Sequence, residues 1–305
     1  MKVLVATEKP FAKVAVEGIR QIVENVGFEL ALLENYTDVN DLYKAVSDAD
    51  ALIVRSDKVT KEVVEHANNL KIVVRAGAGY DNLDLPACSA KNIVAMNTPG
   101  QNSTAVAELA VGMMVFMARG QFNPGTGSEL MGKNVGIQAY GNIGKIVAKI
   151  AKGFGMTVYA FDPFVKKEAI EADGVIVCTT LEELYSKCNY ISLHIPATEQ
   201  TKKSIGYNLL SKMPKGGTLI NTARKEVINE EELAKILEER ADLKYATDFA
   251  TGNQIELNDK FGKRVFAVPK KMGAETAEAN INAGLASANQ IVKFLKTGDT
   301  TFKVN

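Results

Sequence analysis

Short runs rich in β-branched residues alternate along this chain with longer segments whose apolar residues recur at helical spacing. Strands that alternate with helices form parallel sheets, because each helix returns the chain to the edge where the next strand begins. The pattern therefore predicts an α/β protein with doubly wound parallel sheets. The expected strands are KVLVA from Lys2, FELALL from Phe28, ALIV from Ala51, KIVV from Lys71, VGIQA from Val135, TVYAF from Thr157 and TLIN from Thr218.

Three segments are expected to be helices. Residues 11–26 place apolar side chains on one stripe and charged ones on the other, as a helix lying on a sheet requires. Residues 103–119 are apolar nearly all round, which predicts a buried helix. A third helix is expected over residues 276–295, and the Gly- and Pro-rich stretch 120–133 is expected to be a loop.

Length and composition predict two domains and a small-molecule ligand. A chain of 305 residues suits about two domains. Lys plus Arg and Asp plus Glu both number 36, so no overall field attracts nucleic acid or a membrane surface. Cys88, Cys178 and Cys188 form no C-x-x-C pair, which predicts buried thiols in a reducing compartment and no metal site. With no signal peptide or membrane span, a cytoplasmic protein is expected.

The segment VGIQAYGNIGKIV predicts a dinucleotide-binding turn between a strand and a helix. Gly141 would let the backbone approach a pyrophosphate, and Gly144 would let the helix pack closely on the strand. A methyl group at Ala139, where the first glycine is usual, is tolerated if the backbone angles suit an L-residue. The expected cofactor-binding positions in this turn are Ala139, Tyr140, Gly141, Asn142, Ile143 and Gly144.

Asp162 closes the next expected strand, TVYAFD. An acidic side chain there accepts hydrogen bonds from the adenosine ribose and repels a 2′-phosphate, which favours NAD over NADP. The alternative is an aspartate that caps the following turn. The N-terminal strand–helix series has no such glycine turn, so the first domain is not expected to bind the dinucleotide.

Several longer motifs extend over nearly all of the chain: RSDKVTKEVVEHANNLKIVVRAGAGYDNLDL, NTPGQNSTAVAELAVGMM, the glycine turn with FDP, ISLHIPATEQTKKSIG, GGTLINTARKEVINEEEL and YATDF. Together they resemble the D-isomer-specific 2-hydroxyacid dehydrogenase family. The resemblance implies a discontinuous, flavodoxin-like substrate-binding domain (residues 1–98 and 276–305) and a dinucleotide-binding domain (residues 99–275). It also implies a homodimer, and no regulatory domain is expected after Asn305.

The resemblance also assigns site residues. It implies that Arg224 is catalytic, since a planar guanidinium can hold carboxylate and carbonyl oxygens together. It implies that Asp248 receives the nicotinamide carboxamide, and Ser103 could also act as a helix N-cap. The remaining cofactor-binding positions are His194, Pro196, Thr222 and Ala223. The substrate-binding positions are Ala76, Gly77, Asn102 and Ser103, with Arg55 and Arg75 for a phosphate or, alternatively, as ordinary salt-bridge partners.

The general base departs from the family pattern. Where the family has a histidine in a P-H-x-G segment, this chain reads VPKKMGAET. Counting back from Gly273 places Lys271 there, and counting forward from Pro269 places Lys270. A lysine can act if desolvation or nearby cations lower its pKa. His66 lies in a polar helical stretch and is expected on the surface.

The family's glutamate partner is also replaced. Five residues past Asp248 the chain has Asn253, and a carboxylate there would have held a lysine protonated. Glu256 could enter the site by a loop shift. The leading expectation is NAD-dependent oxidation of 3-phosphoglycerate. The alternatives are a dehydrogenase for hydroxypyruvate or glyoxylate, or a catalytically silent NAD-binding regulator.

Overall fold

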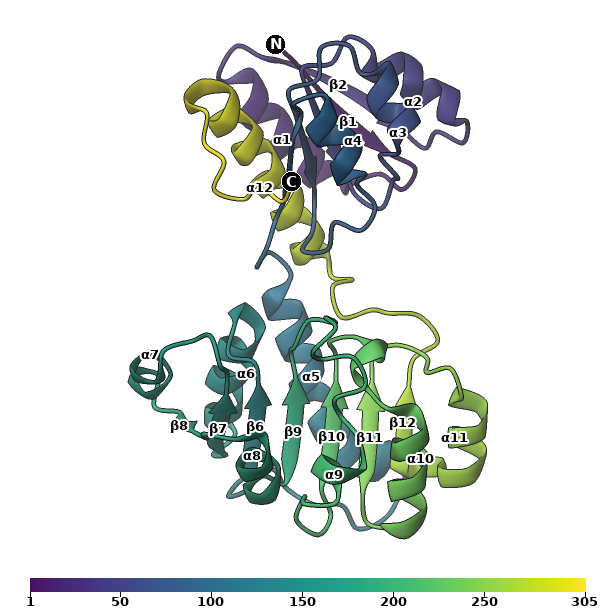
Figure 1. Cartoon of the computed structure of the whole chain (residues 1–305), viewed down its shortest axis with the longest axis vertical. Helices are drawn as coiled ribbons and strands as arrows, with labels where there is room; N and C mark the ends of the chain where they lie inside the picture. Colours follow the sequence, from purple (N-terminus) through teal and green to yellow (C-terminus); the bar gives the residue numbers. More distant parts are fainter. The chain divides into compact units, whose positions relative to one another are not determined.

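The computed structural model describes residues 1–305 and divides them into two compact units. Unit 1 consists of Met1–Asn102 and Glu275–Asn305, and unit 2 of Ser103–Ala274. Each unit contains one all-parallel sheet with helices on both faces (Figure 1). The predicted fold class, two doubly wound parallel α/β sheets, is confirmed.

Unit 1 contains a five-stranded sheet in the order β2-β1-β3-β4-β5. The order reverses between β1 and β3, as in flavodoxin-like folds, and ligands of such sheets bind outside the carboxyl ends of the strands at this point. The strands are β1 (Lys2–Thr7), β2 (Glu29–Glu34), β3 (Ala51–Val54), β4 (Ile72–Arg75) and β5 (Val94–Asn97).

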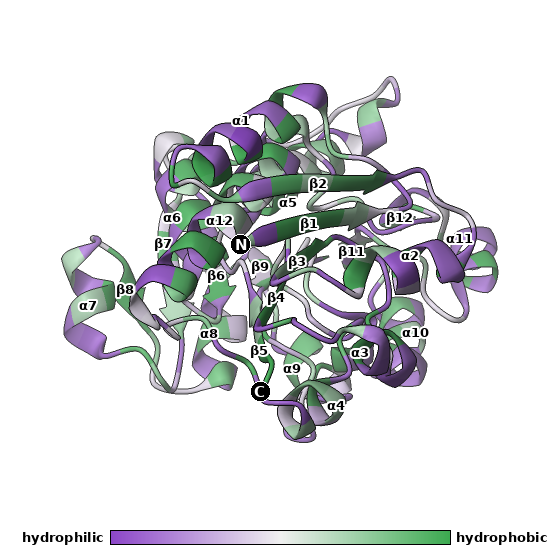
Figure 2. Ribbon diagram, turned by 90° about the horizontal axis from the view of Figure 1, so that it is seen from above, coloured by the Kyte–Doolittle hydropathy of each residue, from purple (hydrophilic) through white to green (hydrophobic).

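Two helical layers cover this sheet. On one face α1 packs beside α12 (Figure 1), and its buried residues Ala15, Ile19 and Val23 form the predicted apolar stripe. Figure 2 shows the contrast between a largely hydrophobic β1 and an α1 that alternates hydrophobic and hydrophilic residues. The helices are α1 (Lys13–Glu24) and α12 (Ala277–Thr297) on that face, and α2 (Val39–Val46), α3 (Lys61–His66) and α4 (Leu85–Ala90) on the other.

Unit 2 contains a seven-stranded sheet in the order β12-β11-β10-β9-β6-β7-β8. Its order reverses between β6 and β9, which is the Rossmann arrangement extended by one strand. The strands are β6 (Asn134–Gln138), β7 (Thr157–Phe161), β8 (Ile176–Val177), β9 (Tyr190–Leu193), β10 (Thr218–Asn221), β11 (Lys244–Thr247) and β12 (Val265–Ala267).

The helices of unit 2 enclose two hydrophobic cores, one on each face of the sheet. The helix predicted over residues 103–119 is α5, and ten of its sixteen residues are buried because it packs against both α6 and the sheet. The helical segments are α5 (Ser103–Ala118), η1 (Gly120–Phe122), α6 (Asn142–Gly153), α7 (Lys167–Ala172), α8 (Leu181–Lys187), α9 (Tyr207–Leu210), η2 (Lys225–Val227), α10 (Glu230–Glu239), α11 (Gln254–Phe261) and η3 (Gly262–Arg264).

Three smaller expectations can be compared with the structure. Cys88, Cys178 and Cys188 are all buried, as small hydrophobic residues would be. His66 is exposed, as predicted, and stacks on Tyr43 with ring centroids 4.3 Å apart. None of the helices combines the length and the apolar character that crossing a membrane requires.

Candidate active site

The glycine turn joins β6 to α6. Gly141 is the N-cap of α6, and a Cβ added there would meet no atom within 4 Å, so its backbone is open to a ligand. A Cβ on Gly144 would lie 2.4 Å from the carbonyl oxygen of Ala139. Only glycine therefore allows the helix to approach the strand this closely.

Ala139 does not meet the condition under which its methyl group would be tolerated without strain. Its φ is +79°, in the left-handed region that favours glycine. The turn therefore keeps the shape of a glycine turn although it contains alanine. Adopting this conformation costs an alanine about 1 kcal/mol.

Asp162 ties the turn to the end of β7. Its Oδ2 accepts a hydrogen bond from the amide of Tyr140 at 2.7 Å. Its Oδ1 accepts from the amides of Phe164 and Val165 at 2.8 and 3.1 Å, which is the capping role considered as the alternative. The ring of Tyr140 is buried, and its hydroxyl contacts Asp173, so only the backbone of Tyr140 lies at the turn.

Three unpaired polar atoms mark the carboxyl ends of the neighbouring strands. Strands β9, β10 and β11 end in register, and the next residues along the chain are His194, Thr222 and Asp248. His194 Nδ1, Thr222 Oγ1 and Asp248 Oδ1 are all buried without a hydrogen-bond partner. Because buried polar groups are nearly always paired, this row of atoms fits a polar ligand lying along the edge. The edge begins at the glycine turn, so a dinucleotide is a suitable ligand.

His194 is a neutral imidazole in this setting. Its Nε2 lies 2.9 Å from the hydroxyl of Ser192. Burial lowers the pKa of His194 to about 3, so near neutral pH the ring carries no charge. The nearby Pro196 is exposed, and its carbonyl accepts a hydrogen bond from Thr201 at 2.6 Å. A neutral His194 can bind a cofactor amide but is a poor candidate for the acid–base residue.

Lys271 lies among residues that follow β10 and β11. Its Nζ donates to the carbonyl of Ala223 at 2.6 Å and lies 3.9 Å from Asp248 Oδ1. Partial burial lowers the pKa of Lys271; Asp248 opposes this change, and Arg224 reinforces it. Lys270 has no hydrogen bond or ion pair with these groups, so of the two lysines it is Lys271 whose side chain reaches them.

The loop that carries Arg224 is held by a residue that the sequence reasoning did not single out. Asn221, buried at the end of β10, accepts from the amide of Ala223 at 3.0 Å and donates to the carbonyl of Arg224 at 3.0 Å. The Arg224 guanidinium donates to the carbonyl of Ala223 at 2.9 Å. The only sequence signal was a polar residue closing the strand TLIN.

Asp248 is fully buried, and its Oδ2 accepts a hydrogen bond from the amide of Gly273 at 2.8 Å. Burial raises the pKa of Asp248, while Lys271 and the amides of Gly273 and Met272 oppose the rise. The bond to Gly273 brings the lysine-bearing segment to the end of β11. Asp248 thus connects the proposed cofactor edge with the proposed base.

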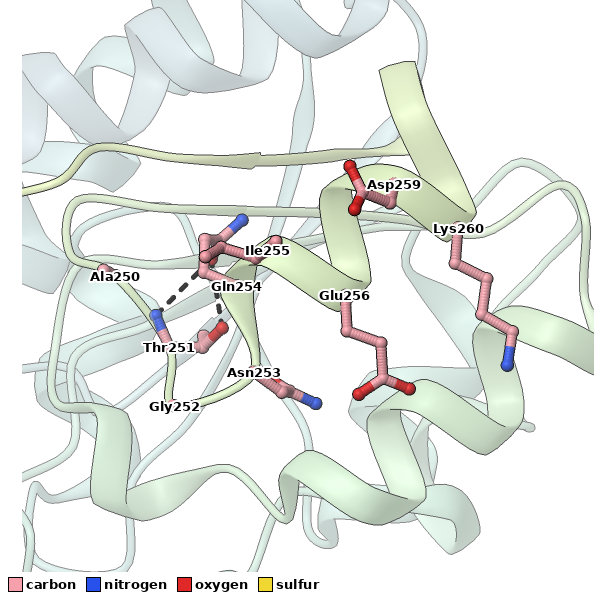
Figure 3. Close-up of a pocket in the computed structure, with 9 residues that line it drawn as sticks. All are labelled: Ala250, Thr251, Gly252, Asn253, Gln254, Ile255, Glu256, Asp259 and Lys260. Carbon is pink, nitrogen blue, oxygen red and sulfur yellow. Dashed lines mark hydrogen bonds between the residues drawn. The ribbon is translucent and has the colours of Figure 1, made fainter.

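Asn253, where the family pattern predicts a glutamate, has no hydrogen bond with Lys271. Asn253 precedes α11 and lines two surface hollows of about 930 and 710 Å³, and its Oδ1 has no partner. Figure 3 shows Gln254 folded back onto Thr251 and Glu256 projecting from α11. Glu256 is exposed and forms no ion pair with Lys271, so it does not replace the glutamate.

Arg55 and Arg75 lie at the carboxyl ends of β3 and β4. The Nη2 of Arg55 donates to Asn280 Oδ1 at 2.6 Å, and its Nη1 reaches two backbone carbonyls at 3.3 Å. Its partners are neutral oxygens rather than the carboxylates of a salt bridge. Arg75 donates through Nε to the carbonyl of Arg55 at 3.0 Å and folds over Gly77, where a Cβ would overlap its guanidinium.

The remaining substrate-binding candidates are Ala76, Gly77, Asn102 and Ser103. Ala76 is buried, and the carbonyl of Gly77 accepts from the amide of Thr98 at 2.9 Å. Asn102 is the last residue of the first segment of unit 1, and the buried Ser103 begins α5 in unit 2.

Asp57 is a further residue that sequence reasoning missed. This buried carboxylate accepts from the amide of Glu8 at 2.6 Å and the hydroxyl of Tyr36 at 3.0 Å, and it also accepts from the amide of Arg55 at 3.3 Å. It thereby fixes the loop that carries Arg55. A carboxylate directly after a buried strand, in RSDK, was the available signal.

A Rossmann-type unit with a glycine turn and a row of unpaired polar atoms defines a dinucleotide-binding α/β protein. Residues 105–270 match the model described as D-isomer specific 2-hydroxyacid dehydrogenase, NAD binding domain. The chain belongs to this family, and unit 2 is its NAD-binding domain.

Known relatives agree with this assignment. The crystal structure of NAD⁺-bound 3-phosphoglycerate dehydrogenase from Entamoeba histolytica is 49% identical with a TM-score of 0.86, covering 100% of this chain and 98% of that one. D-3-phosphoglycerate dehydrogenase from Methanocaldococcus jannaschii is 36% identical over 90% of this chain and 55% of its own length. Hydroxypyruvate reductase from Thermotoga maritima is 34% identical over 88% and 92%. The chain thus spans about half the length of the curated phosphoglycerate dehydrogenases that it matches.

Proposed function

We propose that the chain oxidises D-3-phosphoglycerate to 3-phosphohydroxypyruvate with NAD, the step that opens serine synthesis. The observation that carries the proposal is Lys271, whose Nζ is held by the Ala223 carbonyl beside Asp248 and Arg224. The similarity to the Entamoeba 3-phosphoglycerate dehydrogenase supports the choice of a small phosphorylated 2-hydroxy acid as substrate.

The proposed chemistry divides the work between two basic residues, a neutral Lys271 and a charged Arg224. Neutral Lys271 accepts the hydroxyl proton, and its lowered pKa raises the fraction of neutral amine near pH 7. Arg224 holds the substrate carboxylate through two parallel hydrogen bonds. NAD, when bound, accepts the hydride released from the α carbon.

The proposed NAD site consists of the glycine turn, Asp162 and the polar edge. Residues 139–144 would receive the pyrophosphate at the start of α6. Asp162 would accept from the ribose hydroxyls in addition to its backbone donors. Asp248 would pair with the nicotinamide carboxamide, and His194 and Thr222 with other polar groups of the cofactor, with Pro196 and Ala223 beside them.

We assign further substrate contacts to the candidate residues described above. Arg55 and Arg75 are proposed to bind the phosphate, and Ala76, Gly77, Asn102 and Ser103 the carboxylate. A second candidate is a hydroxypyruvate or glyoxylate reductase. It is favoured by the full engagement of Arg55 with Asn280 and two carbonyls, and by the relative from Thermotoga.

NADH oxidation with 3-phosphohydroxypyruvate, hydroxypyruvate and glyoxylate tests these assignments. Lys271→Ala should abolish turnover, and Lys270→Ala is the matched control one residue away. Arg55→Ala should raise the KM for the phosphorylated substrate only. Fast turnover of hydroxypyruvate that is unaffected by Arg55→Ala would select the second candidate. NADH binding without turnover of any of these acids would identify a silent regulator.

We further propose a cytoplasmic homodimer. Three free, buried cysteines suit a reducing compartment. Sedimentation of the purified chain tests the dimer, and a monomer at all micromolar concentrations would exclude it.

A further inference from the structure

The ammonium group of Lys271 has an unusual set of neighbours. Its hydrogen bond goes to a neutral oxygen, the carbonyl of Ala223 at 2.6 Å. The carboxylate of Asp248 forms a long ion pair with the ammonium group at 3.9 Å, beyond hydrogen-bond distance, and its nearest oxygen has no hydrogen-bond partner. Asn253, five residues past Asp248, is neutral, and its Oδ1 has no hydrogen-bond partner. No carboxylate is therefore hydrogen-bonded to this amine.

A third neighbour is the ring of Phe249, whose centroid lies 5.3 Å from Lys271 Nζ. The face of an aromatic ring attracts a cation at distances up to about 6 Å. Phe249 is only 8% exposed, yet it belongs to none of the four hydrophobic cores. The ring is therefore buried beside the amine and outside the clusters that pack on the sheet faces.

We propose that Phe249 is a positioning residue for Lys271, whose ring face holds the ammonium form and supplies stabilisation that a hydrogen-bonded carboxylate would otherwise give. The inference rests on the proposed function, in which Lys271 moves the substrate proton. In this proposal Phe249 does not contact the substrate or the cofactor and acts only through Lys271.

The charged groups that face Lys271 come from two loops. Asp248, after β11, and Glu226, in η2, favour the ammonium form, whereas Arg224, before η2, disfavours it. Replacing the ring by leucine leaves these three charges and the apolar surroundings in place. It removes only the attraction between the ring face and the cation, so the neutral amine becomes more favoured.

Phe249→Leu is expected to shift the pH–rate profiles of oxidation and reduction in the same direction. Substrate oxidation uses neutral Lys271, so its rate rises as pH passes the pKa of the amine; reduction uses the ammonium form and falls over the same range. Phe249→Leu should move both midpoints to lower pH by roughly half a unit, as one partly exposed cation–π contact predicts.

A cofactor-free measurement tests the inference directly. The full-length protein is pulsed with acetic anhydride at a series of pH values, and acetylation of Lys271 is quantified by mass spectrometry, with the exposed Lys270 as internal reference. The variants are Phe249→Leu, Phe249→Tyr and the control Phe261→Leu. Phe261 is also buried and lies under Lys260, with 5.8 Å between Nζ and the ring centroid, outside the site.

The inference expects a lower Lys271 midpoint in Phe249→Leu and wild-type midpoints in Phe249→Tyr and Phe261→Leu. An unchanged or higher midpoint in Phe249→Leu would overturn it, and so would equal shifts in the leucine and tyrosine variants, which would indicate altered packing. Rate profiles of Lys271→Gln separate the two proposals. If the wild-type pH limb persists in that variant, the assignment of Lys271 itself fails; if it disappears while Phe249→Leu has no effect, only the role of Phe249 fails.

Discussion

Lys271 and Arg224 share one hydrogen-bond acceptor, the carbonyl oxygen of Ala223, at 2.6 and 2.9 Å. Two cations on a single oxygen lie close together, and each disfavours the charge of the other. Arg224 thereby contributes to the lowered pKa of Lys271. The loop that closes β10 thus holds the proposed carboxylate-binding group and the proposed base in one arrangement.

Substitution of Arg224 should separate its charge from its shape. Arg224→Lys keeps the cation but loses the two parallel bonds, so kcat/KM should fall about 10- to 100-fold. The pH midpoint of Lys271 should stay near the wild-type value. Arg224→Gln removes the charge and should move that midpoint upward. Steady-state rates across pH measure both effects, and identical profiles for the two variants would contradict the shared-acceptor account.

Ala139→Gly should stabilise the protein by about 1 kcal/mol, because glycine adopts the observed φ of +79° without steric cost. The matched variant is Gly141→Ala, at φ −82° with open space around its Cβ. It should leave the stability of the cofactor-free protein nearly unchanged but weaken NAD binding about tenfold or more. Urea unfolding and titration with NADH provide the measurements. Full NAD affinity in Gly141→Ala would show that the pyrophosphate lies elsewhere.

Gly144→Ala should destabilise unit 2 by about 1–3 kcal/mol, since the new methyl group would meet the Ala139 carbonyl at 2.4 Å. Gly153→Ala, in the same helix, meets no atom within 4 Å and serves as the control. That variant should be neutral or slightly stabilising. The denaturation midpoint of Gly144→Ala should therefore lie clearly below that of Gly153→Ala. Equal midpoints would refute the close contact between helix and strand.

The free energy of unfolding should depend on pH because of His194. Its pKa of about 3 in the folded protein lies below the ordinary value of 6.5, so the unfolded chain binds a proton first as the pH falls. The stabilisation is complete above pH 6.5 and is lost between there and pH 3, by at most about 1.4 kcal/mol per pH unit. The free energy of unfolding of His194→Gln, measured over this range, should fall less steeply than that of the wild type. Parallel curves would place the protonated imidazole in contact with water.

The glycine turn could be predicted from the sequence because it depends on the spacing of nearby residues. Gly144 is needed wherever a helix packs directly on the preceding strand, so its spacing from Gly141 carries the geometry. The backbone angle of Ala139 could not be predicted in the same way. Its φ depends on how the whole turn closes onto Asp162, which arrives from the next strand.

The choice between Lys270 and Lys271 needed three-dimensional contacts. Counting back from Gly273 gives Lys271, and counting forward from Pro269 gives Lys270, so the sequence allows both. The hydrogen bond between Asp248 and the Gly273 amide fixes the segment so that Lys271 reaches the carbonyl of Ala223. Phe249 escaped notice for a related reason. An aromatic residue beside an aspartate looks like ordinary core until its ring is found near a cation and outside every core.

The register of β9, β10 and β11 has an evolutionary consequence. The last paired residues of β9, β10 and β11 are followed directly by His194, Thr222 and Asp248. These candidate site residues therefore lie just outside the hydrogen-bonded part of the sheet. A substitution in a loop after the strands can change which residue transfers a proton without changing how the strands pair. Under the proposed function, the proton carrier at Lys271 also lies in a loop after a strand, so an exchange at that position leaves the strand pairing unchanged.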